Sequence, residues 1–503
     1  MTRPRIPAAA LAVLRRVASL RAEPVWLVGG AVRDLAGGRP LSDLDLAGRD
    51  AKGLAAACVK EFGGTLVVLD DHNGVYRVVL PKEKGPLQLD CAELQGASIG
   101  EDLARRDFTV NAAALALSPK LGASPRPADF LDPRGGLADL ARGVLRCEEE
   151  RLFVEDPLRL LRAFRLAAQH GLSIDEPTLR MIRRRRQDAR QPAAERVRAE
   201  LVGLLDCPGA PALLRLMDEC GLLTAVLEEL EPARKCAEAY YGPGGVLAHT
   251  LAVCERLDFL LTRFKSLYPG QAKAFWSRLA ARAPGDAPPR ALLMLGALLH
   301  DIAKPETAKR VDGRLRFFEH DLIGAERAAA VLKRLRFSRS AIDAVAAVVR
   351  HHLRPGHLVS GGGATDKAVY RLFRDLGDDA PSLLAVCWAD HASYLPEPRL
   401  LRALKAATAD PSADGRELAR LKPEEVRKTV RHLQLVSSLL RRGLAPGPGP
   451  VPERLLDGSA VMKALKLAPG PKVGEALEKL REAQATGKVR TREEALAFLS
   501  RLK

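Results

Sequence analysis

The stretch Leu27–Asp34 reads LVGGAVRD, and the triplet DLD follows at Asp43–Asp45. The apolar residues that precede the glycines predict a short strand, and the residues from Ala31 onward predict a helix. Gly29 and Gly30 therefore fall between a strand and a helix. Glycine lets backbone N–H groups come close to a ligand, and the N-terminus of a helix favours anions. This junction is typical of a phosphate-binding site.

The aspartates Asp43 and Asp45 fall in an apolar run, 41–46, that predicts a second strand. Residues two apart on a strand project from the same face, so the two carboxylates can share a ligand. Hard oxygen ligands of this kind suit a pair of Mg²⁺ ions. Arg33, expected on the first helical turn, would add a charge-assisted contact to a triphosphate. An isolated acid pair in a turn is the alternative, and the upstream Gly-Gly favours the metal site.

The periodicity changes along the chain. Short β-rich runs separated by turn residues predict further strands at 65–69, 75–80 and 87–91. Asp90 in the last run is a candidate third carboxylate or a solvent-facing residue of an edge strand. From Pro157 onward periodic Leu and Ala predict helices throughout, with no strand. We therefore predict an α+β fold: a small mixed-sheet head, then an all-helical neck and body. The Gly-Gly junction followed by the acid pair resembles the head of the polymerase-β nucleotidyltransferase superfamily.

Composition limits the functional class. The chain has 503 residues and a formal net charge of +17, which suits a polyanionic partner or reflects an arginine-rich proteome. The eight cysteines form no C-x-x-C pair, so neither a zinc ribbon nor a disulfide framework is indicated. No apolar run reaches the ~20 residues that span a bilayer, and no membrane partner is expected. A helix from about Ala8 is expected in place of a signal peptide, and the cytoplasm is the expected location.

Two further motifs follow in order: RRDFTVNA at 105–112 and EDPLRLLRAFR at 155–165. Together with the glycine junction and the acid pair, they resemble the signatures of class II CCA-adding tRNA nucleotidyltransferases and bacterial poly(A) polymerases. The resemblance implies that Arg106 contacts the incoming nucleotide. It also implies that Asp107 and Asn111 shape the surroundings of the sugar and the metal. A capped helix with alanine-rich packing is the structural alternative for this motif.

Asp156 and Arg159 are three residues apart and are expected on one face of a helix. A carboxylate accepts hydrogen bonds and a guanidinium donates them. Cytosine and adenine each offer an amino donor beside a ring-nitrogen acceptor, whereas guanine and uracil offer the reverse. One such pair can therefore accept CTP and ATP and reject GTP and UTP, with Arg162 and Arg165 reaching phosphate or base. A surface ion pair on a neck helix is the alternative.

A second set of motifs contains most of the histidines, including the pair His300-Asp301. Their order resembles an HD-type metal-dependent phosphohydrolase domain. The resemblance implies one divalent transition metal, of unknown identity, on four ligands: His249, His300, Asp301 and Asp390. It implies that His320 and His352 bind a second metal ion, with His351 as an alternative ligand to His352. Imidazole and carboxylate ligands on separate helices leave room for water and phosphate.

The expected domains are an N-terminal helix (1–22), a nucleotidyltransferase head (23–145), a neck with the base-reading helix (146–235), an HD domain (246–395), a helical connector (396–444) and a helical RNA-binding tail (453–503). The resemblance implies two-metal addition of CCA to the 3′ end of tRNA from CTP and ATP, accompanied by an HD phosphohydrolase activity. A poly(A) polymerase, or an enzyme that adds CC or A alone, is the near alternative. An HD phosphohydrolase whose head merely binds RNA is the alternative from another class. The sequence does not define the oligomeric state.

Overall fold

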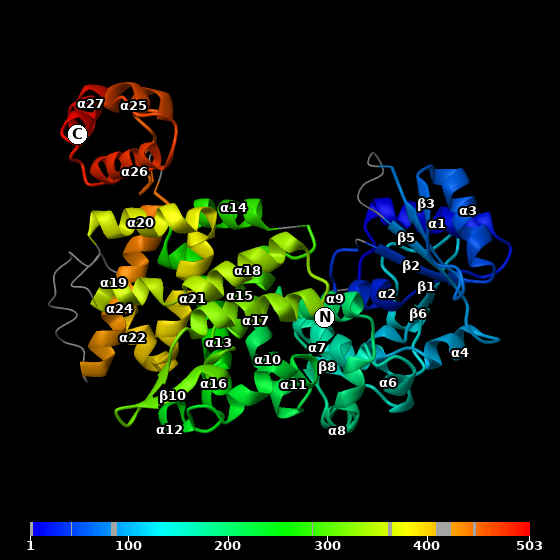
Figure 1. Cartoon of the computed structure of the whole chain (residues 1–503). Coiled ribbons are helices and arrows are strands. Elements are labelled where there is room, and N and C mark those ends of the chain that lie inside the picture. Colours follow the sequence, from blue (N-terminus) through cyan, green and yellow to red (C-terminus); the bar gives the residue numbers. More distant parts are fainter. Residues whose placement is uncertain are drawn as a thin grey trace. The chain divides into compact units, whose positions relative to one another are not determined.

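The structure is a computed structural model that describes residues 4–41, 43–81, 88–283, 285–360, 365–408, 424–445 and 449–502. The chain forms two compact units (Figure 1). The first contains Met1–Pro192 and Cys220–Ala225, and the second contains Ala193–Glu219 and Val226–Lys503. The predicted neck, 146–235, contributes to both units. The predicted domain limits otherwise stay a prediction.

The first unit contains a seven-stranded sheet in the order β3-β4-β5-β2-β1-β6-β7. Its strands are β1 (Trp26–Val28), β2 (Asp43–Gly48), β3 (Thr65–Asp70), β4 (Val75–Val79), β5 (Gln88–Glu93), β6 (Ala114–Ala116) and β7 (Phe130–Leu131). β2 and β5 pair in parallel, and the other neighbours pair antiparallel. The mixed sheet expected from the sequence is thus confirmed. Leu87 and Ser42, which fall in predicted strands, lie outside the described residues.

The pleat of β2 separates apolar from acidic side chains. Leu44 and Leu46 are fully buried in a core that also contains Leu14 of α1 (Ala8–Leu20) and Leu54 of α3 (Ala51–Phe62). Because successive side chains alternate between faces, Asp43 and Asp45 project from the face opposite these helices. The remaining helices of the first unit are α2 (Gly29–Ala36), α4 (Ile99–Ala104), α5 (Gly136–Arg142), α6 (Arg151–Glu155), α7 (Arg159–His170) and α8 (Glu176–Arg185).

The motif at 105–114 does not form the helix considered from the sequence. Thr109–Asn111 is a single 3₁₀ turn, and the chain then enters strand β6 at Ala114. The Thr109 N–H donates to the carbonyl of Arg146, which ties the turn to the following segment. The short turn places Asp107 and Asn111 beside the sheet instead of along a helix.

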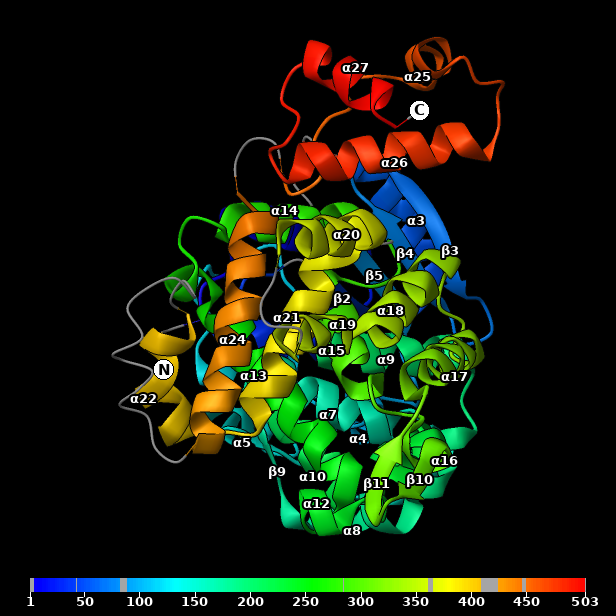
Figure 2. The same ribbon diagram turned by 60° about the vertical axis from the view of Figure 1, so that its left-hand side comes forward.

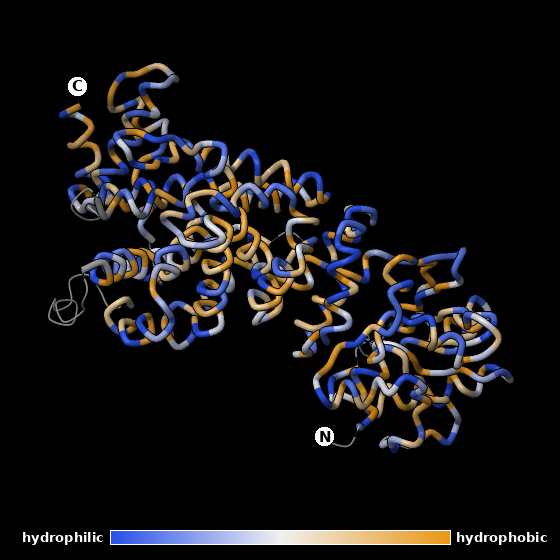
Figure 3. Tube along the Cα trace, turned by 90° about the horizontal axis from the view of Figure 1, so that it is seen from below, coloured by the Kyte–Doolittle hydropathy of each residue, from blue (hydrophilic) through white to orange (hydrophobic). Residues whose placement is uncertain are grey.

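The second unit is mainly helical (Figure 2). Its principal helices are α9 (Ala194–Leu205), α10 (Ala210–Glu219), α13 (Gly245–Leu267), α14 (Ala272–Arg282), α15 (Pro289–Leu299), α17 (His320–Arg334), α18 (Arg339–His351), α20 (Asp366–Leu376), α21 (Ala380–Ser393), α22 (Glu397–Ala407) and α24 (Glu424–Gly443). It also contains the short helices α12 (Glu238–Tyr241), α16 (Lys304–Thr307) and α19 (Arg354–Ser360). Hydrophobic residues gather in the interior of this unit and hydrophilic residues on its outer turns (Figure 3).

Two pairs of strands contradict the expectation of no strand after Pro157. A hairpin of β10 (Ala308–Val311) and β11 (Arg314–Phe317) precedes α17. In the first unit, β9 (Ser173–Ile174) pairs with β8 (Val144–Leu145). The hairpin was missed because half of its strand residues are cationic: Lys309, Arg310, Arg314 and Arg316. Its Asp312-Gly313 turn, with both residues at positive φ, is nevertheless the dipeptide that two-residue hairpins favour.

The last part of the chain has a core of its own. Helices α25 (Gly458–Leu465), α26 (Pro471–Ala485) and α27 (Arg492–Ser500) enclose buried residues such as Val461, Leu480 and Leu499. Residues 445–452, between the predicted connector and the predicted tail, fall partly outside the described residues, at 446–448. Within the part of the chain that the structure describes, no helix combines the length and the apolarity needed to cross a bilayer.

Candidate active sites

The glycine junction lies at the end of β1, where α2 starts at Gly29. Gly29 has a φ of +62°, and a Cβ there would lie 2.8 Å from Nη1 of Arg106 and 3.4 Å from Oδ2 of Asp45. A Cβ at Gly30 would lie 3.2 Å from the same carboxylate oxygen. Side chains at these positions would fill the space between the cation and the acid. The two glycines therefore keep the backbone open to a ligand.

Three carboxylates share the open face of the sheet. Asp45 lies opposite Asp90 in the parallel β2–β5 register, and Asp43 is two residues before Asp45. The Ala31 N–H donates to Oδ2 of Asp45 at 3.1 Å, and Arg77 donates two hydrogen bonds of 2.7 Å to Asp90. Burial, with Asp90 and Asp43 nearby, raises the pKa of Asp45. The excess of negative charge on this face is what a bound divalent cation would neutralise.

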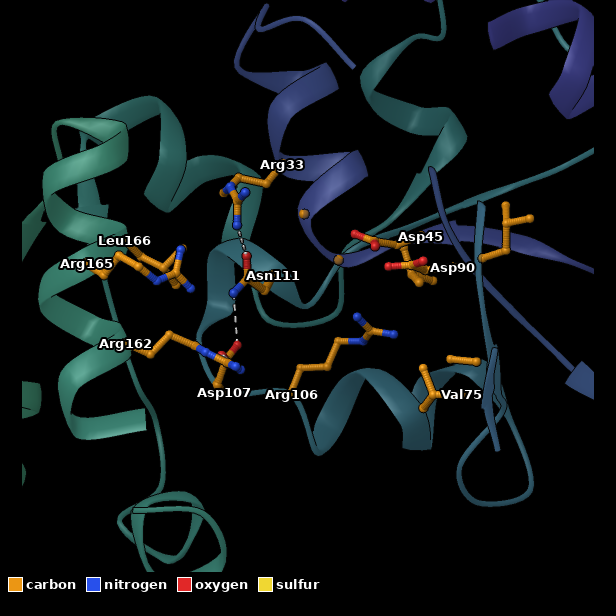
Figure 4. A pocket seen from close by; sticks show the side chains of 15 residues that line it. Arg33, Asp45, Val75, Asp90, Arg106, Asp107, Asn111, Arg162, Arg165 and Leu166 are labelled. Atoms are coloured by element: carbon orange, nitrogen blue, oxygen red, sulfur yellow. Dashed lines mark hydrogen bonds and ion pairs between the residues drawn. The ribbon is translucent and has the colours of Figure 1, made fainter. Parts of the chain in front are cut away.

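A chain of polar contacts crosses the site (Figure 4). Arg33 donates from Nη1 to Oδ1 of Asn111 at 2.6 Å, and Asn111 donates to Oδ1 of Asp107 at 2.9 Å. Arg162 lies 3.3 Å from the other Asp107 oxygen. Although burial opposes it, Arg162 and Asn111 hold the pKa of Asp107 below its usual value. Asp107 is thus ionised and keeps Asn111 and Arg162 in position. Arg33 is the fifth residue of α2, one turn later than expected.

A cavity of about 610 Å³ joins these groups. It is lined by nine of the predicted site residues: Gly29, Gly30, Arg33, Asp45, Arg106, Asp107, Asn111, Arg162 and Arg165. The candidate third carboxylate, Asp90, lines it as well. The carboxylates of Asp45 and Asp90 lie side by side, and Arg106 faces them (Figure 4). Arg162 and Arg165 enter from α7 on the opposite wall. Asp43 starts β2 on the same face but is not among the lining residues.

The predicted geometry of Asp156 and Arg159 is wrong. Asp156 follows α6 with an extended backbone, φ −141° and ψ 93°, and α7 begins at Arg159. The residue before a proline is driven from the helical region, and Pro157 has this effect on Asp156. Arg159 donates to the carbonyl of Leu152 at 3.0 Å. The pair therefore does not share a helical face, and the roles assigned to it stay a prediction.

A smaller cavity of about 260 Å³ lies beside the first, with which it shares three residues: Arg106, Asp107 and Arg162. Arg159 lines this cavity, as does Asp102, which receives two hydrogen bonds from Arg106. The guanidinium of Arg159 thus adjoins the cavity that holds Asp45. Asp156 is not among its lining residues.

The second unit brings together the residues of the predicted HD site. Nε2 of His249 lies 3.2 Å from Asp390 and 3.6 Å from Asp301, and Nε2 of His300 lies 3.1 Å from Asp301. On the other side, Oδ1 of Asp301 lies 3.5 Å from His320 and 3.6 Å from His352. These six residues form what we call the histidine cluster. Asp301 lies between its two halves, each with the spacing of a metal site.

The orientation of the histidines favours metal binding. The Nδ1 atoms of His300, His320 and His352 each lie 2.7 Å from a backbone carbonyl. When the ring is neutral, this contact makes Nδ1 the protonated nitrogen, and Nε2 then faces the cluster as an acceptor. Nε2 of His249 and of His300, Oδ1 of Asp301 and Oδ1 of Asp390 are buried without a hydrogen-bond partner among the described residues. A divalent metal would satisfy these atoms, so the residues fit such an ion.

The cluster combines an ionised carboxylate with a neutral imidazole. Although burial opposes it, His300 and Lys304 hold the pKa of Asp301 well below its usual value. Burial lowers the pKa of His352 to about 4, which keeps this ring neutral. His352 faces the cluster, whereas the neighbouring His351 is outside both groups with metal-binding spacing. The geometry therefore favours His352 over His351.

Lys304 was missed as a site residue in the sequence. Its Nζ donates to Oδ2 of Asp301 at 2.6 Å and to the Tyr241 hydroxyl at 2.7 Å. It lies three residues after Asp301 at the start of α16, and this spacing was the available signal. A cation at this position can contact a phosphate bound at the cluster.

Three segments match described families. Residues 25–146 match the "Poly A polymerase head domain", and residues 171–234 match the "Probable RNA and SrmB-binding site of polymerase A". Residues 272–395 match the "HD domain". Members of the nucleotidyltransferase and HD families typically use divalent metals. The first segment contains the glycine junction, the acidic face and Arg106, whereas Arg162 and Arg165 of α7 lie outside it. The third contains the histidine cluster except His249.

Curated relatives span nearly the whole chain. An A-adding tRNA nucleotidyltransferase of Deinococcus radiodurans is 33% identical, over 94% of this chain and 94% of its own. A CC-adding tRNA nucleotidyltransferase of Thermus thermophilus is 35% identical, over 94% of this chain and 92% of its own. The fold is similar to that of the Thermotoga maritima CCA-adding enzyme complexed with tRNA, with a TM-score of 0.62 at 21% identity, over 99% of this chain and 97% of that one. The chain belongs to the tRNA nucleotidyltransferase family and carries an HD domain.

Proposed function

We propose that this enzyme extends the 3′ end of tRNA with nucleotides from CTP and ATP, and that its product is CCA. One observation carries the proposal: Asp45 and Asp90 face Arg106 across a cavity that the open Gly29–Gly30 backbone also lines. The cavity thus combines acids for a metal, cations for phosphates and exposed backbone at a helix N-terminus. This is the set of groups that nucleotidyl transfer requires.

The reaction needs no nucleophile from the protein. The 3′-hydroxyl oxygen of the RNA bonds to the α-phosphorus of the nucleotide, and the bond from that phosphorus to the bridging oxygen breaks. Pyrophosphate leaves, and the hydroxyl proton passes to solvent. Asp43 and Asp45 are the proposed ligands of Mg²⁺, which when bound would assist deprotonation of the hydroxyl and neutralise the leaving group. Arg33 and Arg106 hold the triphosphate, while Asp107 and Asn111 keep Arg33 and Arg162 in place.

Base selection is proposed to use Asp156 with Arg159, because a carboxylate and a guanidinium together complement the edges of cytosine and adenine. Arg159 lines the smaller cavity beside the acidic face. Asp156 lies at the turn that precedes the helix of Arg159. A buried charge left unpaired by guanine or uracil would cost several kcal/mol, on the order of 10²-fold or more in discrimination. Arg162 and Arg165 of the same helix line the larger cavity and would contact phosphate or base.

The product is tested with three tRNAs: one that lacks the terminal CCA, one that ends in CC and one that ends in CCA. Each is incubated with one labelled nucleotide at a time. Addition of two C residues and then one A supports the proposal. An open-ended ladder of A would identify a poly(A) polymerase instead. Because relatives named for CC addition and for A addition both span this chain, the alternative outcomes are CC alone on the shortest tRNA and A alone on the tRNA that ends in CC.

A second proposed function is hydrolysis of phosphoesters at the histidine cluster. It is supported by the four buried polar atoms of the cluster that have no hydrogen-bond partner in the described part of the chain, and by the two groups of candidate ligands that share Asp301. A divalent transition metal, when bound, would lower the pKa of a water molecule and polarise the phosphate. Lys304 would hold a phosphate oxygen, and Asp301 orients Lys304. The double substitution His300→Ala/Asp301→Ala should abolish hydrolysis of a 2′,3′-cyclic phosphate, while nucleotide transfer continues.

We further propose that the enzyme acts in the cytoplasm, where its tRNA substrate would be available. The eight cysteines, all in described segments, form no disulfide, as expected in a reducing compartment. Fractionation of cells that produce the tagged chain tests this proposal. Recovery with tRNA in the soluble cytoplasmic fraction supports it, and recovery in a secreted or membrane fraction contradicts it.

A further inference from the structure

A second cavity in the helical unit, of about 630 Å³, has no role in the functions proposed so far. Its lining comes from α12, α21, α22 and α24 and from the turn after α21. It combines rings and cations: Tyr240, Tyr394, His391, His432, Arg399 and Lys428. Among the described residues that line it, none is acidic. Its volume lies within the range of small-molecule sites, roughly 300–1,000 Å³.

This cavity adjoins the histidine cluster. The ring of Tyr394 lies 5.4 Å from that of His249, and Tyr241, which stacks on His249 at 4.7 Å, meets Tyr240 edge-on at 4.8 Å. His391 directly follows Asp390 on α21. Tyr394 thus lines the cavity and also contacts His249 of the histidine cluster, so the two sites are adjacent.

The lining separates a flat apolar surface from a charged rim. His391 stacks on His432 with ring centroids 4.3 Å apart and an angle of 27° between the rings. Nδ1 of His432 is buried without a hydrogen-bond partner among the described residues, so it can serve a polar ligand atom. Tyr240 and Tyr394 are 72% and 43% exposed, and Arg399 and Lys428 are exposed as well. Rings of this kind suit a nucleobase, and the cations suit a phosphate.

We propose that this cavity binds the nucleoside of a 2′,3′-cyclic phosphate, which is either a free nucleotide or the end of an RNA strand. The cyclic phosphate of that nucleoside lies at the histidine cluster. The inference rests on the proposed hydrolase function. The base stacks on the tyrosine and histidine rings and bonds to His432. Because the cluster already holds the ester that is cleaved, Arg399 and Lys428 bind a second phosphate, on the 5′ side of the same nucleoside. In the reaction, water bonds to the ester phosphorus, the bond from phosphorus to one ribose oxygen breaks, and that oxygen takes a proton from the water.

The test compares four cyclic esters on the full chain loaded with divalent metal. They are glycerol 1,2-cyclic phosphate, adenosine 2′,3′-cyclic phosphate, the same nucleotide with a 5′-phosphate, and a dinucleotide that ends in a 2′,3′-cyclic phosphate. For the wild type, KM should fall about tenfold on adding the base and about tenfold again on adding the 5′-phosphate. A free 5′-phosphorylated nucleotide and an RNA end share this chemistry, and the ester with the lower KM identifies the source.

Two variants test the residues. Lys428→Glu should remove the advantage of the 5′-phosphate, whereas Arg431→Glu, an exposed position on the same helix outside the lining, should retain it. His432→Phe keeps a ring against His391 but loses Nδ1; it should raise KM for every nucleoside ester about tenfold and leave the glycerol ester unchanged. In both variants kcat should stay within about twofold, because the cluster is intact.

The outcomes separate this inference from the function on which it rests. If the wild type hydrolyses the glycerol ester and the adenosine ester with the same KM, the cavity does not bind the nucleoside, although the hydrolase proposal stands. Unchanged KM values in both variants would refute the inference in the same way. If no ester is hydrolysed, both the hydrolase proposal and this inference are wrong.

Discussion

Replacement of Gly29 by alanine tests how the backbone opens the transferase site. The residue has a φ of +62°, and the added Cβ would lie 2.8 Å from Nη1 of Arg106, closer than non-bonded contact allows. Arg106 is held by two hydrogen bonds to Asp102, of 2.9 and 3.1 Å, so its guanidinium moves at the expense of those bonds. The substitution therefore acts on both backbone strain and the position of a phosphate-binding cation.

The two effects have different sizes. A left-handed conformation costs a non-glycine residue about 1–2 kcal/mol, and this is the expected loss of folding stability. In a unit of this size the loss lowers Tm by roughly 2–8 °C. Displacing the cation from the triphosphate removes a charge-assisted contact worth about 1.5–3 kcal/mol, which corresponds to a fall in kcat/KM of roughly 10- to 150-fold.

Gly143→Ala is the matched control. Gly143 has a φ of +71°, and a Cβ there meets nothing within 4 Å. Both variants should lose similar stability by thermal denaturation, but only Gly29→Ala should lose incorporation of labelled CTP. Equal incorporation by the two variants would refute the reasoning, because strain without obstruction would then explain the whole effect.

Three further predictions concern the helical unit. His352→Ala should abolish hydrolysis of 2′,3′-cyclic phosphate, while His351→Ala retains it; the reverse result would exchange the two ligands. Addition of a divalent metal at about 100 times its Kd should raise the free energy of urea unfolding by roughly 2.7 kcal/mol, and Asp301→Asn should remove this gain. An equal gain in the wild type and the variant would place the metal elsewhere. Burial, with His391 and Lys428 nearby, lowers the pKa of His432 from 6.5 to about 4. Between these two pH values the unfolded chain binds more protons than the folded chain, so the free energy of unfolding falls as the pH falls. His432→Gln should make that fall shallower in urea unfolding at a series of pH values, and an unchanged slope would contradict the assigned protonation.

The acidic face could be predicted because its signal is local. The alternation of Leu44 and Leu46 with Asp43 and Asp45 assigns the two sets to opposite faces of one strand, whatever the rest of the fold. The position of Asp90 opposite Asp45 could not be derived in the same way. It depends on the parallel pairing of β2 with β5, which are separated by a helix and two strands.

The sequence around Asp156 and Arg159 contains a local signal against the geometry predicted for this pair. A spacing of three places residues on one helical face only where both are helical, and Pro157 disfavours the helical region at Asp156. The sequence thus contained the evidence that α7 starts later. The Asp312-Gly313 turn of the missed hairpin is a second example, concealed by the cationic residues on either side.

The histidine cluster was predicted from the order of its residues, whereas its geometry was not. That Asp301 lies between the two histidine groups depends on how α13, α17, α18 and α21 pack around the end of α15. The adjoining cavity with His432 could not have been found from the sequence. It exists because α24 (Glu424–Gly443) packs beside α21 (Ala380–Ser393), although another helix, α22, separates the two in the sequence.

The most direct test of the central claim is incorporation of labelled CTP and ATP into tRNA that lacks its 3′ end, by the wild type and by Asp43→Ala/Asp45→Ala. The wild type should add C, C and A in discrete steps. The double variant should keep its fold and its binding to tRNA but incorporate neither nucleotide. Incorporation at the wild-type rate by the double variant would show that the acidic face does not catalyse the transfer.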